Sequence, residues 1–300
     1  MIAAKPDINQ LSKLLHEGDI HALARSLTLV ENDIQPAEKL LKLLHINRKI
    51  PVVGITGPPG AGKSTLVNAI TDEFCKLKKR IAILAVDPTS PFNYGSLLGD
   101  RIRMSKHFNQ PSVYIRSVAT RGSLGGISAK TLEMLDVLRA GNFDLVIVET
   151  VGVGQSEVDI AGLADKTILV LVPEAGDEIQ HIKSGLMEVA QAFVVNKADR
   201  EGADGFANKL QKMVKEQHQN IPVFKTIADK NIGIESLCDW ILNSDPTIGV
   251  RQELLLAEQA YRLIQAKKMK DIKREEILKS IKEALKDGNF NMYNFIEQWL

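Results

Sequence analysis

Hydrophobic and polar positions divide the chain into a helical beginning, an alternating middle and a helical end. Over residues 8–46, apolar residues recur at intervals of three and four, which is typical of one buried face of a helix. We therefore predict a small N-terminal helical subdomain over residues 1–47. Its apolar stripes are Leu11, Leu14 and Leu15, then Ile20, Leu23 and Leu27, then Ala37, Leu40, Leu41 and Leu44.

The middle of the chain, residues 48–245, alternates short apolar runs with longer segments that suit helices. The runs cover residues 50–56, 81–86, 113–116, 145–148, 167–172 and 192–195. Strands that are apolar throughout are typical of a parallel sheet buried on both faces. The pattern therefore predicts an α/β fold, with a mostly parallel sheet flanked by helices and ligands bound at the carboxyl ends of the strands.

The first of these strands leads into a glycine-rich loop that opens a helix. Residues 57–64 read Gly-Pro-Pro-Gly-Ala-Gly-Lys-Ser and match G-x-x-x-x-G-K-[ST], the phosphate-binding loop. The glycines let backbone N–H groups face phosphate oxygens, Lys63 is a point charge for the β- and γ-phosphates, and Ser64 offers a hydroxyl to Mg²⁺. The sequence thus predicts a P-loop NTPase. Its predicted nucleotide contacts are Gly57, Pro58, Pro59, Gly60, Ala61, Gly62, Lys63, Ser64 and Thr65.

A second motif selects the base. Asn196-Lys197-Ala198-Asp199 matches N-K-x-D and follows the strand at 192–195. Asp199 can accept hydrogen bonds from guanine N1–H and the 2-amino group, and a site built for those donors rejects adenine, which lacks the pair. Asn196 is expected to connect this loop to the phosphate loop, and the stem of Lys197 to lie against the base. The nucleotide is therefore predicted to be GTP or GDP.

Carboxylates that follow other strands predict magnesium. Asp87 ends the second strand, Asp100 lies in the loop beyond it, and Glu149 ends the strand at 145–148. Carboxylates that converge on a triphosphate require a metal between them. We therefore predict Mg²⁺, held directly or through water by Ser64, Asp87, Asp100 and Glu149.

The segment after Glu149 predicts slow hydrolysis. Glu149-Thr150-Val151-Gly152 stands where a GTPase usually has D-x-x-G, and the Gly152 N–H can sense the γ-phosphate. Val153 follows, where a Ras-like enzyme has a glutamine that orients water, and an apolar side chain cannot orient water. Gln155 is either a partial substitute or an ordinary loop amide. We predict a GTPase that is slow without a partner, and its catalytic candidates are Lys63, Asp100, Glu149 and Gln155.

Composition excludes several other classes. The 300 residues carry 38 Lys and Arg against 37 Asp and Glu. This balanced charge does not favour binding to nucleic acid or to an anionic membrane. Cys75 and Cys238 lie far apart and form no disulfide or metal-binding pattern. The N-terminus lacks a secretory apolar core, and no apolar run reaches the ~18–20 residues of a membrane span. We expect a cytoplasmic protein that binds neither nucleic acid nor a membrane.

The last segment, residues 246–300, is helical in pattern and rich in charge. Its charged face is simply solvated, or its apolar stripe is buried against a second copy of the chain. We assign the segment to a C-terminal helical dimerisation arm and expect a homodimer. The stripe comprises Leu254, Leu255, Ala257, Ala260, Tyr261 and Ile264, then Ile277, Ile281 and Leu285.

Taken together, several segments resemble the methylmalonyl-CoA mutase-associated GTPases, the MeaB/ArgK family in the SIMIBI class of P-loop GTPases. The resemblance covers about residues 10–240. It is carried by residues 23–31 (Leu-Ala-Arg-Ser-Leu-Thr-Leu-Val-Glu), 54–65, 86–91 (Val-Asp-Pro-Thr-Ser-Pro), 95–104, 121–126 (Arg-Gly-Ser-Leu-Gly-Gly) and 148–157.

The resemblance implies a GTP-hydrolysing protein chaperone that gates the delivery of adenosylcobalamin to an acyl-CoA mutase of the methylmalonyl-CoA mutase type and protects that mutase. It also implies that Asp87, Asp100 and Glu149 serve the Mg²⁺ region and that C-terminal helices form a homodimer. A loop over residues 173–183 is expected to couple the nucleotide to the mutase.

Two departures from the family pattern change these expectations. Glu174 and His181 replace usual glycines in the coupling loop, so we expect the coupling step to differ in this chain. Thr226-Ile227-Ala228 stands where the family has a Ser-Ala pair behind the guanine. Ala228 is therefore the expected contact there, with a weaker hold on the base.

Three other functions remain open. A metal-insertion GTPase of the same class, such as a nickel chaperone, needs a Cys/His site or an N-terminal His tract, and the sequence has neither. A small-molecule or transport-system kinase needs an acceptor pocket and leaves N-K-x-D unexplained. The third function is a scaffold that uses GTP only as a structural ligand, and multiple-turnover hydrolysis separates it from an enzyme.

Overall fold

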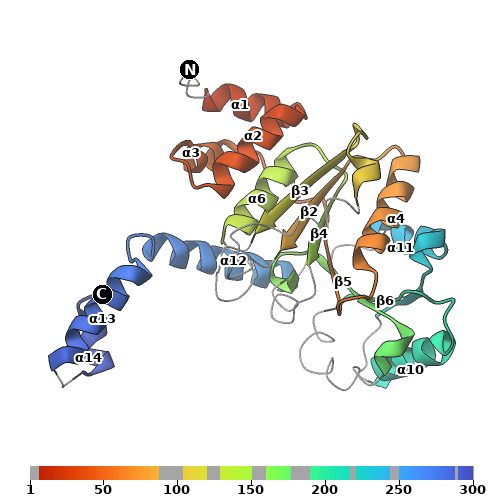
Figure 1. Cartoon of the computed structure of the whole chain (residues 1–300). Coiled ribbons are helices and arrows are strands. Elements are labelled where there is room, and N and C mark those ends of the chain that lie inside the picture. The colour runs from red at the N-terminus through yellow and green to blue at the C-terminus, as the bar shows by residue number, and fades with distance from the viewer. Residues whose placement is uncertain are drawn as a thin grey trace. The chain divides into compact units, whose positions relative to one another are not determined.

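One parallel sheet forms the centre of the fold. The computed structural model describes residues 7–87, 104–119, 129–150, 160–176, 190–216, 221–243, 250–287 and 290–299. Within them, seven strands lie in the order β3-β2-β4-β1-β5-β6-β7, and every neighbouring pair is parallel (Figure 1). The predicted parallel α/β sheet is confirmed. The strands are β1 (Val52–Thr56), β2 (Ile81–Asp87), β3 (Val113–Ala119), β4 (Leu145–Thr150), β5 (Lys166–Leu171), β6 (Ala192–Val195) and β7 (Val223–Lys225).

Helices cover both faces of the sheet, because successive residues of a strand point to opposite sides. Val53 and Ile55 of β1 belong to a hydrophobic core shared with α4 and α11. Leu169 and Phe193 point the other way and pack with α10, while α6 covers the rest of that second face (Figure 1). Burial on both faces explains why the predicted runs contain so few polar positions. These helices are α4 (Lys63–Lys76), α6 (Ala129–Ala140), α10 (Ala203–Glu216) and α11 (Ile234–Asn243).

Three N-terminal helices pack with α6, in one core that continues onto the sheet. They are α1 (Ile8–His16), α2 (Ile20–Glu31) and α3 (Pro36–Leu43). Asp19 caps α2, since its carboxylate accepts the N–H of Ala22 at 2.6 Å. Leu15 is fully buried, as predicted, but Leu14 and Ile20 are more than a third exposed. The predicted stripes are wrong at these two positions, which lie beside the buried face of each helix rather than on it.

The apolar pattern misses one strand and misjudges the bounds of others. β3 continues three residues beyond the predicted run, because Ser117, Val118 and Ala119 pair with the last three residues of β2. β7 was not predicted, because it has only three residues and none of them is buried. β1 begins at Val52 rather than at residue 50, since Pro51 has no N–H to donate to a neighbouring strand.

The C-terminal residues Leu256–Leu300 form a compact unit of their own, distinct from the unit Met1–Leu255. Within it, the ring of Phe295 is buried and lies 5.6 Å from Phe290 and 6.4 Å from Trp299, centroid to centroid. Tyr261 and Ile264 are more than half exposed, and α13 contains no buried residue. Much of the predicted apolar stripe is therefore exposed in a single chain. The helices here are α12 (Val250–Lys268), α13 (Arg274–Ala284) and α14 (Met292–Glu297).

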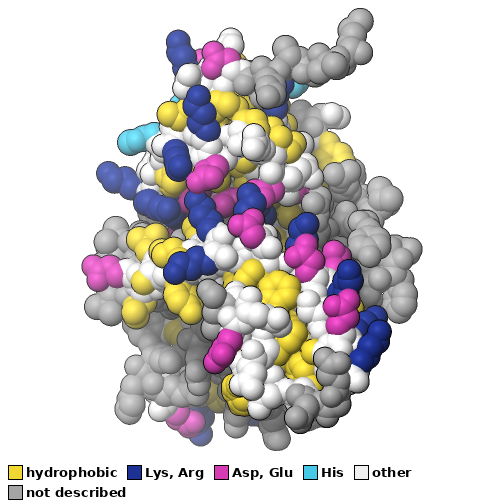
Figure 2. Space-filling model, turned by 90° about the vertical axis from the view of Figure 1, so that its left-hand side faces the viewer, with side chains coloured by type: hydrophobic (Ala, Val, Ile, Leu, Met, Phe, Trp, Pro, Cys, Tyr) yellow, Lys and Arg dark blue, Asp and Glu magenta, His cyan; other side chains and the backbone are white. Residues whose placement is uncertain are grey.

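The described surface mixes charges of both signs. On the face in Figure 2, Lys and Arg side chains lie beside Asp and Glu side chains, with hydrophobic side chains among them. This mixture fits a net charge of +1. Among the described helices, none is both long and apolar enough to cross a membrane. The remaining short elements are the 3₁₀ helices η1 (Ser105–His107), η2 (Ile160–Gly162), η3 (Pro173–Gly176), η4 (Ala228–Lys230) and η5 (Leu285–Asp287).

Candidate functional site

The loops that follow the strands meet at one edge of the sheet, because the strands are parallel. Thr56 ends β1, Asp87 ends β2 and Val195 ends β6. The phosphate loop, the ends of β2 and β4 and the N-K-x-D loop are thus brought to the same edge. Several predicted residues lie outside the described part of the chain: Asp100, Gly152, Val153, Gln155 and His181.

Two glycines fix the shape of the phosphate loop. Gly57 has φ 144° and Gly62 has φ 85°, values that other residues rarely adopt. A Cβ on Gly57 would lie 2.1 Å from the Val170 carbonyl oxygen of β5, and one on Gly62 would lie 2.4 Å from Nδ2 of Asn196. Gly62 directly precedes α4, so the N-terminus of this helix lies at the loop and offers N–H groups to an anion.

The ammonium group of Lys63 lies inside its own loop. Lys63 is 6% exposed, and its Nζ donates to the carbonyl oxygens of Gly57 at 2.7 Å and Pro58 at 3.0 Å. Neutral carbonyls are weaker partners for an ammonium than phosphate oxygens are. The cation is therefore placed where a triphosphate could take over its hydrogen bonds.

Ser64 and Glu149 place hard oxygen donors beside the loop. The Ser64 hydroxyl donates to Oε1 of Glu149 at 2.6 Å, and both side chains are buried. Asp87 ends β2, and β2 pairs with β4 so that Val86 lies opposite Thr150, next to Glu149. A hydroxyl paired with a carboxylate at the start of a phosphate-binding helix fits the chemistry of Mg²⁺. Within the described residues, no group of three or more His, Cys, Asp or Glu side chains could hold a metal by itself.

Asn196 connects the loops of this edge. Its Nδ2 donates to the Ala61 carbonyl oxygen of the phosphate loop at 2.9 Å. Its Oδ1 accepts the Thr226 hydroxyl at 3.1 Å and the Ala228 N–H at 3.2 Å. Asn196 is 2% exposed, so both ends of the amide are satisfied inside the protein. The predicted connection to the phosphate loop is confirmed, and the connection to Thr226 is an addition that the motif does not reveal.

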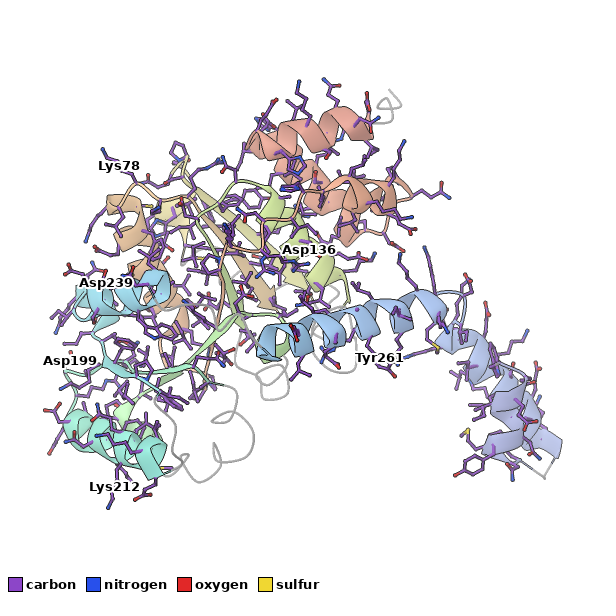
Figure 3. The ribbon with its side chains drawn as sticks, turned by 180° about the vertical axis from the view of Figure 1, so that it is seen from behind. Lys78, Asp136, Asp199, Lys212, Asp239 and Tyr261 are labelled. Atoms are coloured by element: carbon purple, nitrogen blue, oxygen red, sulfur yellow. The ribbon has the colours of Figure 1, made fainter. Side chains whose placement is uncertain are left out.

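The next residues of the same loop face outward. Lys197 has φ 55°, and its Nζ donates to the Gly60 carbonyl oxygen at 2.7 Å. Asp199, labelled in Figure 3, accepts a hydrogen bond from Nζ of Lys230 at 3.2 Å through Oδ2. That hydrogen bond lowers the pKa of the Asp199 carboxyl. Asp199 is therefore held as a carboxylate, the form that can accept both guanine donors.

An ion pair joins the N-K-x-D loop to η3. The guanidinium of Arg200 donates to Oε1 of Glu174, and this contact lowers the pKa of the Glu174 carboxyl. The sequence singled out Glu174 as a departure from the family pattern but gave no partner for it. Arg200 and Lys230 carried no motif signal at all, because both lie beside motifs rather than within them.

Comparison with known proteins assigns the family. The model described as "Methylmalonyl Co-A mutase-associated GTPase MeaB" matches residues 23–286. The chain belongs to this family. It is therefore a P-loop GTPase, whose reaction converts GTP and water to GDP and phosphate.

Individual relatives agree with this family. A protein of Pyrococcus abyssi that carries a provisional GTPase name is 48% identical over 242 residues, which is 78% of this chain and 75% of the relative. A protein of Geobacillus kaustophilus named fused isobutyryl-CoA mutase is 36% identical over 234 residues, which is 72% of this chain but 22% of the fused protein. A crystal structure of LAO/AO transport system kinase shares the fold, with a TM-score of 0.68 and 24% identity over 99% of this chain and 98% of the other.

The close approach at Gly62 gives a prediction about stability. Gly62 and Gly60 both have positive φ, 85° and 79°, so alanine adds similar backbone strain at either position, roughly 1–2 kcal/mol. Only at Gly62 would the new Cβ clash, with Asn196, since no described atom lies within 4 Å at Gly60. In urea unfolding without nucleotide, we expect Gly62→Ala to be about 1–2 kcal/mol less stable than Gly60→Ala. Equal stabilities would show that Asn196 is not held against the loop.

Proposed function

We propose that this GTPase is a protein chaperone for an adenosylcobalamin-dependent acyl-CoA mutase, and that GTP hydrolysis gates cofactor delivery to the mutase and protects it. The observation that carries the proposal is the fused isobutyryl-CoA mutase of Geobacillus kaustophilus, in which a segment similar to this chain is part of the same polypeptide as a mutase. The family description supports the same partner class. Fusion of two activities is the arrangement expected where separate proteins associate.

In this proposal, the phosphate loop holds the nucleotide and Lys63 moves its hydrogen bonds from Gly57 and Pro58 to the β- and γ-phosphates. Ser64 and Glu149 would hold Mg²⁺, and the sequence motifs assign Asp87 and Asp100 to the same role. Bound Mg²⁺ would neutralise charge that develops on the phosphates. The hydroxyl–carboxylate contact that supports this role is already present in the chain.

Guanine recognition is assigned to the loops that Asn196 connects. Asp199 accepts the N1–H and 2-amino donors, the stem of Lys197 lies against the base, and Ala228 contributes its backbone beside the base. Asn196 itself is too buried to read the base. Its role is to hold the base-reading loops at a fixed place relative to the phosphate loop.

Partner control is assigned to the segments after β4 and after β5. Val153 offers no atom that can orient a water molecule, so hydrolysis by the chain alone is slow, and Gln155 is the nearest candidate to supply that function.

The Arg200–Glu174 ion pair links the base-reading loop to η3, where the coupling loop 173–183 begins. Both side chains are about half exposed. Such a pair is weak, which suits a contact that opens and closes.

A second copy of the chain is the proposed partner of residues 246–300. The supporting observation is the exposed apolar surface of this segment, including Tyr261, Ile264, Leu278 and Leu285. A helical arm with an uncovered apolar stripe gains stability when a symmetric partner covers it.

Asp199→Asn is expected to move nucleotide preference from guanine toward xanthine. The amide presents one acceptor and one donor, so it no longer matches guanine but can pair with the 2-oxo group of xanthine. Competition between GTP and XTP for the purified chain measures the shift. If Asp199→Asn keeps the preference of the unaltered chain for GTP, Asp199 does not read the base.

Mutase addition is expected to raise GTP turnover at least about tenfold, which corresponds to roughly 1.4 kcal/mol of barrier. The measurement is phosphate release in multiple turnover, with and without a purified adenosylcobalamin-dependent acyl-CoA mutase from the same source. Lys63→Ala is the matched control and should show no turnover in either case. Unchanged turnover with mutase, while GTP still binds tightly, would contradict the chaperone proposal and leave a GTPase with another partner.

A further inference from the structure

The turn that follows β7 is closed by its own backbone. Ile227 and Ile232 form an antiparallel bridge, with N···O distances of 3.0 and 3.2 Å in the two directions. Inside it, the Lys230 N–H donates to the Ile227 carbonyl oxygen at 3.0 Å, and Asn231 adopts φ 56°. A Cβ on Gly233 would lie 2.2 Å from the Lys225 carbonyl oxygen, so the exit of the turn is also fixed. The backbone of Lys230 therefore has little freedom to move.

The same turn is anchored to the candidate nucleotide site. The N–H of Ala228, at the start of η4, donates to Asn196, and the Thr226 carbonyl oxygen accepts the Ala198 N–H at 3.0 Å. Lys230, the last residue of η4, then reaches Oδ2 of Asp199 with its ammonium at 3.2 Å. Two elements that are 31 positions apart in the chain are thus joined at the carboxylate that is proposed to read guanine.

The geometry leaves room for both the lysine and the base. A carboxylate has two oxygens and about four lone-pair sites, so an ammonium on Oδ2 leaves sites for guanine N1–H and the 2-amino group. An ionised carboxylate is needed, because a protonated one would present a donor to those donors. Lys230 and, at longer range, Arg200 are the cations that favour the ionised form of Asp199.

We propose that Lys230 is a positioning residue for guanine recognition: its ammonium holds the Asp199 carboxylate in the orientation in which that carboxylate accepts both guanine donors. The proposal rests on the proposed role of Asp199 as the reader of the base. Lys230 itself makes no contact with the base in this account. The residue lies outside both N-K-x-D and the Ser-Ala position, so no motif assigns it a role.

Titration calorimetry with GDP on Lys230→Ala tests the proposal. Lys230 and Asp199 are 56% and 41% exposed, and exposed pairs contribute modestly, so GDP affinity should fall about two- to fivefold. The loss should shrink toward nothing in ~1 M salt, and Lys230→Arg should restore most of the affinity. The matched control is Lys225→Ala, whose ammonium is 53% exposed and pairs at 2.7 Å with Asp204 rather than with Asp199. Its GDP affinity should match that of the unaltered chain.

The pH profile of GDP binding supplies a readout that a merely structural lysine would not change. Because Lys230 lowers the pKa of Asp199, its removal raises that pKa. Affinity for GDP is lost as pH falls through the pKa of Asp199, so Lys230→Ala should lose affinity at a higher pH than the unaltered chain. Coincident pH profiles, together with equal affinities at low salt, would overturn the proposal.

A double-mutant cycle distinguishes a failure of the proposed role of Lys230 from a failure of the proposed role of Asp199. In the Asp199→Asn background, Lys230→Ala should leave XDP affinity unchanged, because the charge pair is already absent. A loss of the same size in both backgrounds would mean that Lys230 acts elsewhere, and the proposal fails. If Asp199→Asn itself does not shift preference toward XDP, the assignment of Asp199 fails first, and the role of Lys230 fails with it.

Discussion

One buried side chain, Asn196, sets the relative positions of three loops at the carboxyl edge of the sheet. It donates to Ala61 in the phosphate loop and accepts from Thr226 and Ala228 in the turn after β7. Removing a buried amide of this kind leaves several polar groups without partners, each at a cost of about 1–3 kcal/mol. Asn196 therefore connects the phosphate loop to the base-reading loops, as a ligand that spans both regions requires.

Around this fixed frame, the cations of the site are held by the protein's own oxygens. Lys63 donates to carbonyls of its own loop, Lys197 donates to Gly60, and Lys230 donates to Asp199. In the proposed account, a bound triphosphate gives Lys63 charged phosphate partners in place of neutral carbonyls, and hydrogen bonds to charged partners are stronger. Lys230 keeps its contact with Asp199. The exposed Arg200–Glu174 ion pair connects the residue after N-K-x-D to η3, in a segment assigned to partner control.

The sequence predicted those parts of the site that are contiguous or periodic. The phosphate loop and N-K-x-D are short motifs with local geometry. The sheet was predicted from continuous apolar runs, which are typical of strands buried on both faces. The pattern did not predict contacts between distant elements. Lys230 with Asp199 and Arg116 with Glu31 both depend on the tertiary arrangement, and neither pair has a local signature.

Comparison of GDP and ADP affinities in the presence of Mg²⁺, for the unaltered chain and for Asn196→Ala, tests the central claim most directly. The account predicts that the unaltered chain binds GDP at least about a hundredfold more tightly than ADP, because a site built to accept the two guanine donors discriminates strongly against a base that lacks them. Asn196→Ala should weaken GDP binding about tenfold or more. Equal affinities for GDP and ADP, or an Asn196→Ala chain that binds GDP as the unaltered chain does, would contradict it.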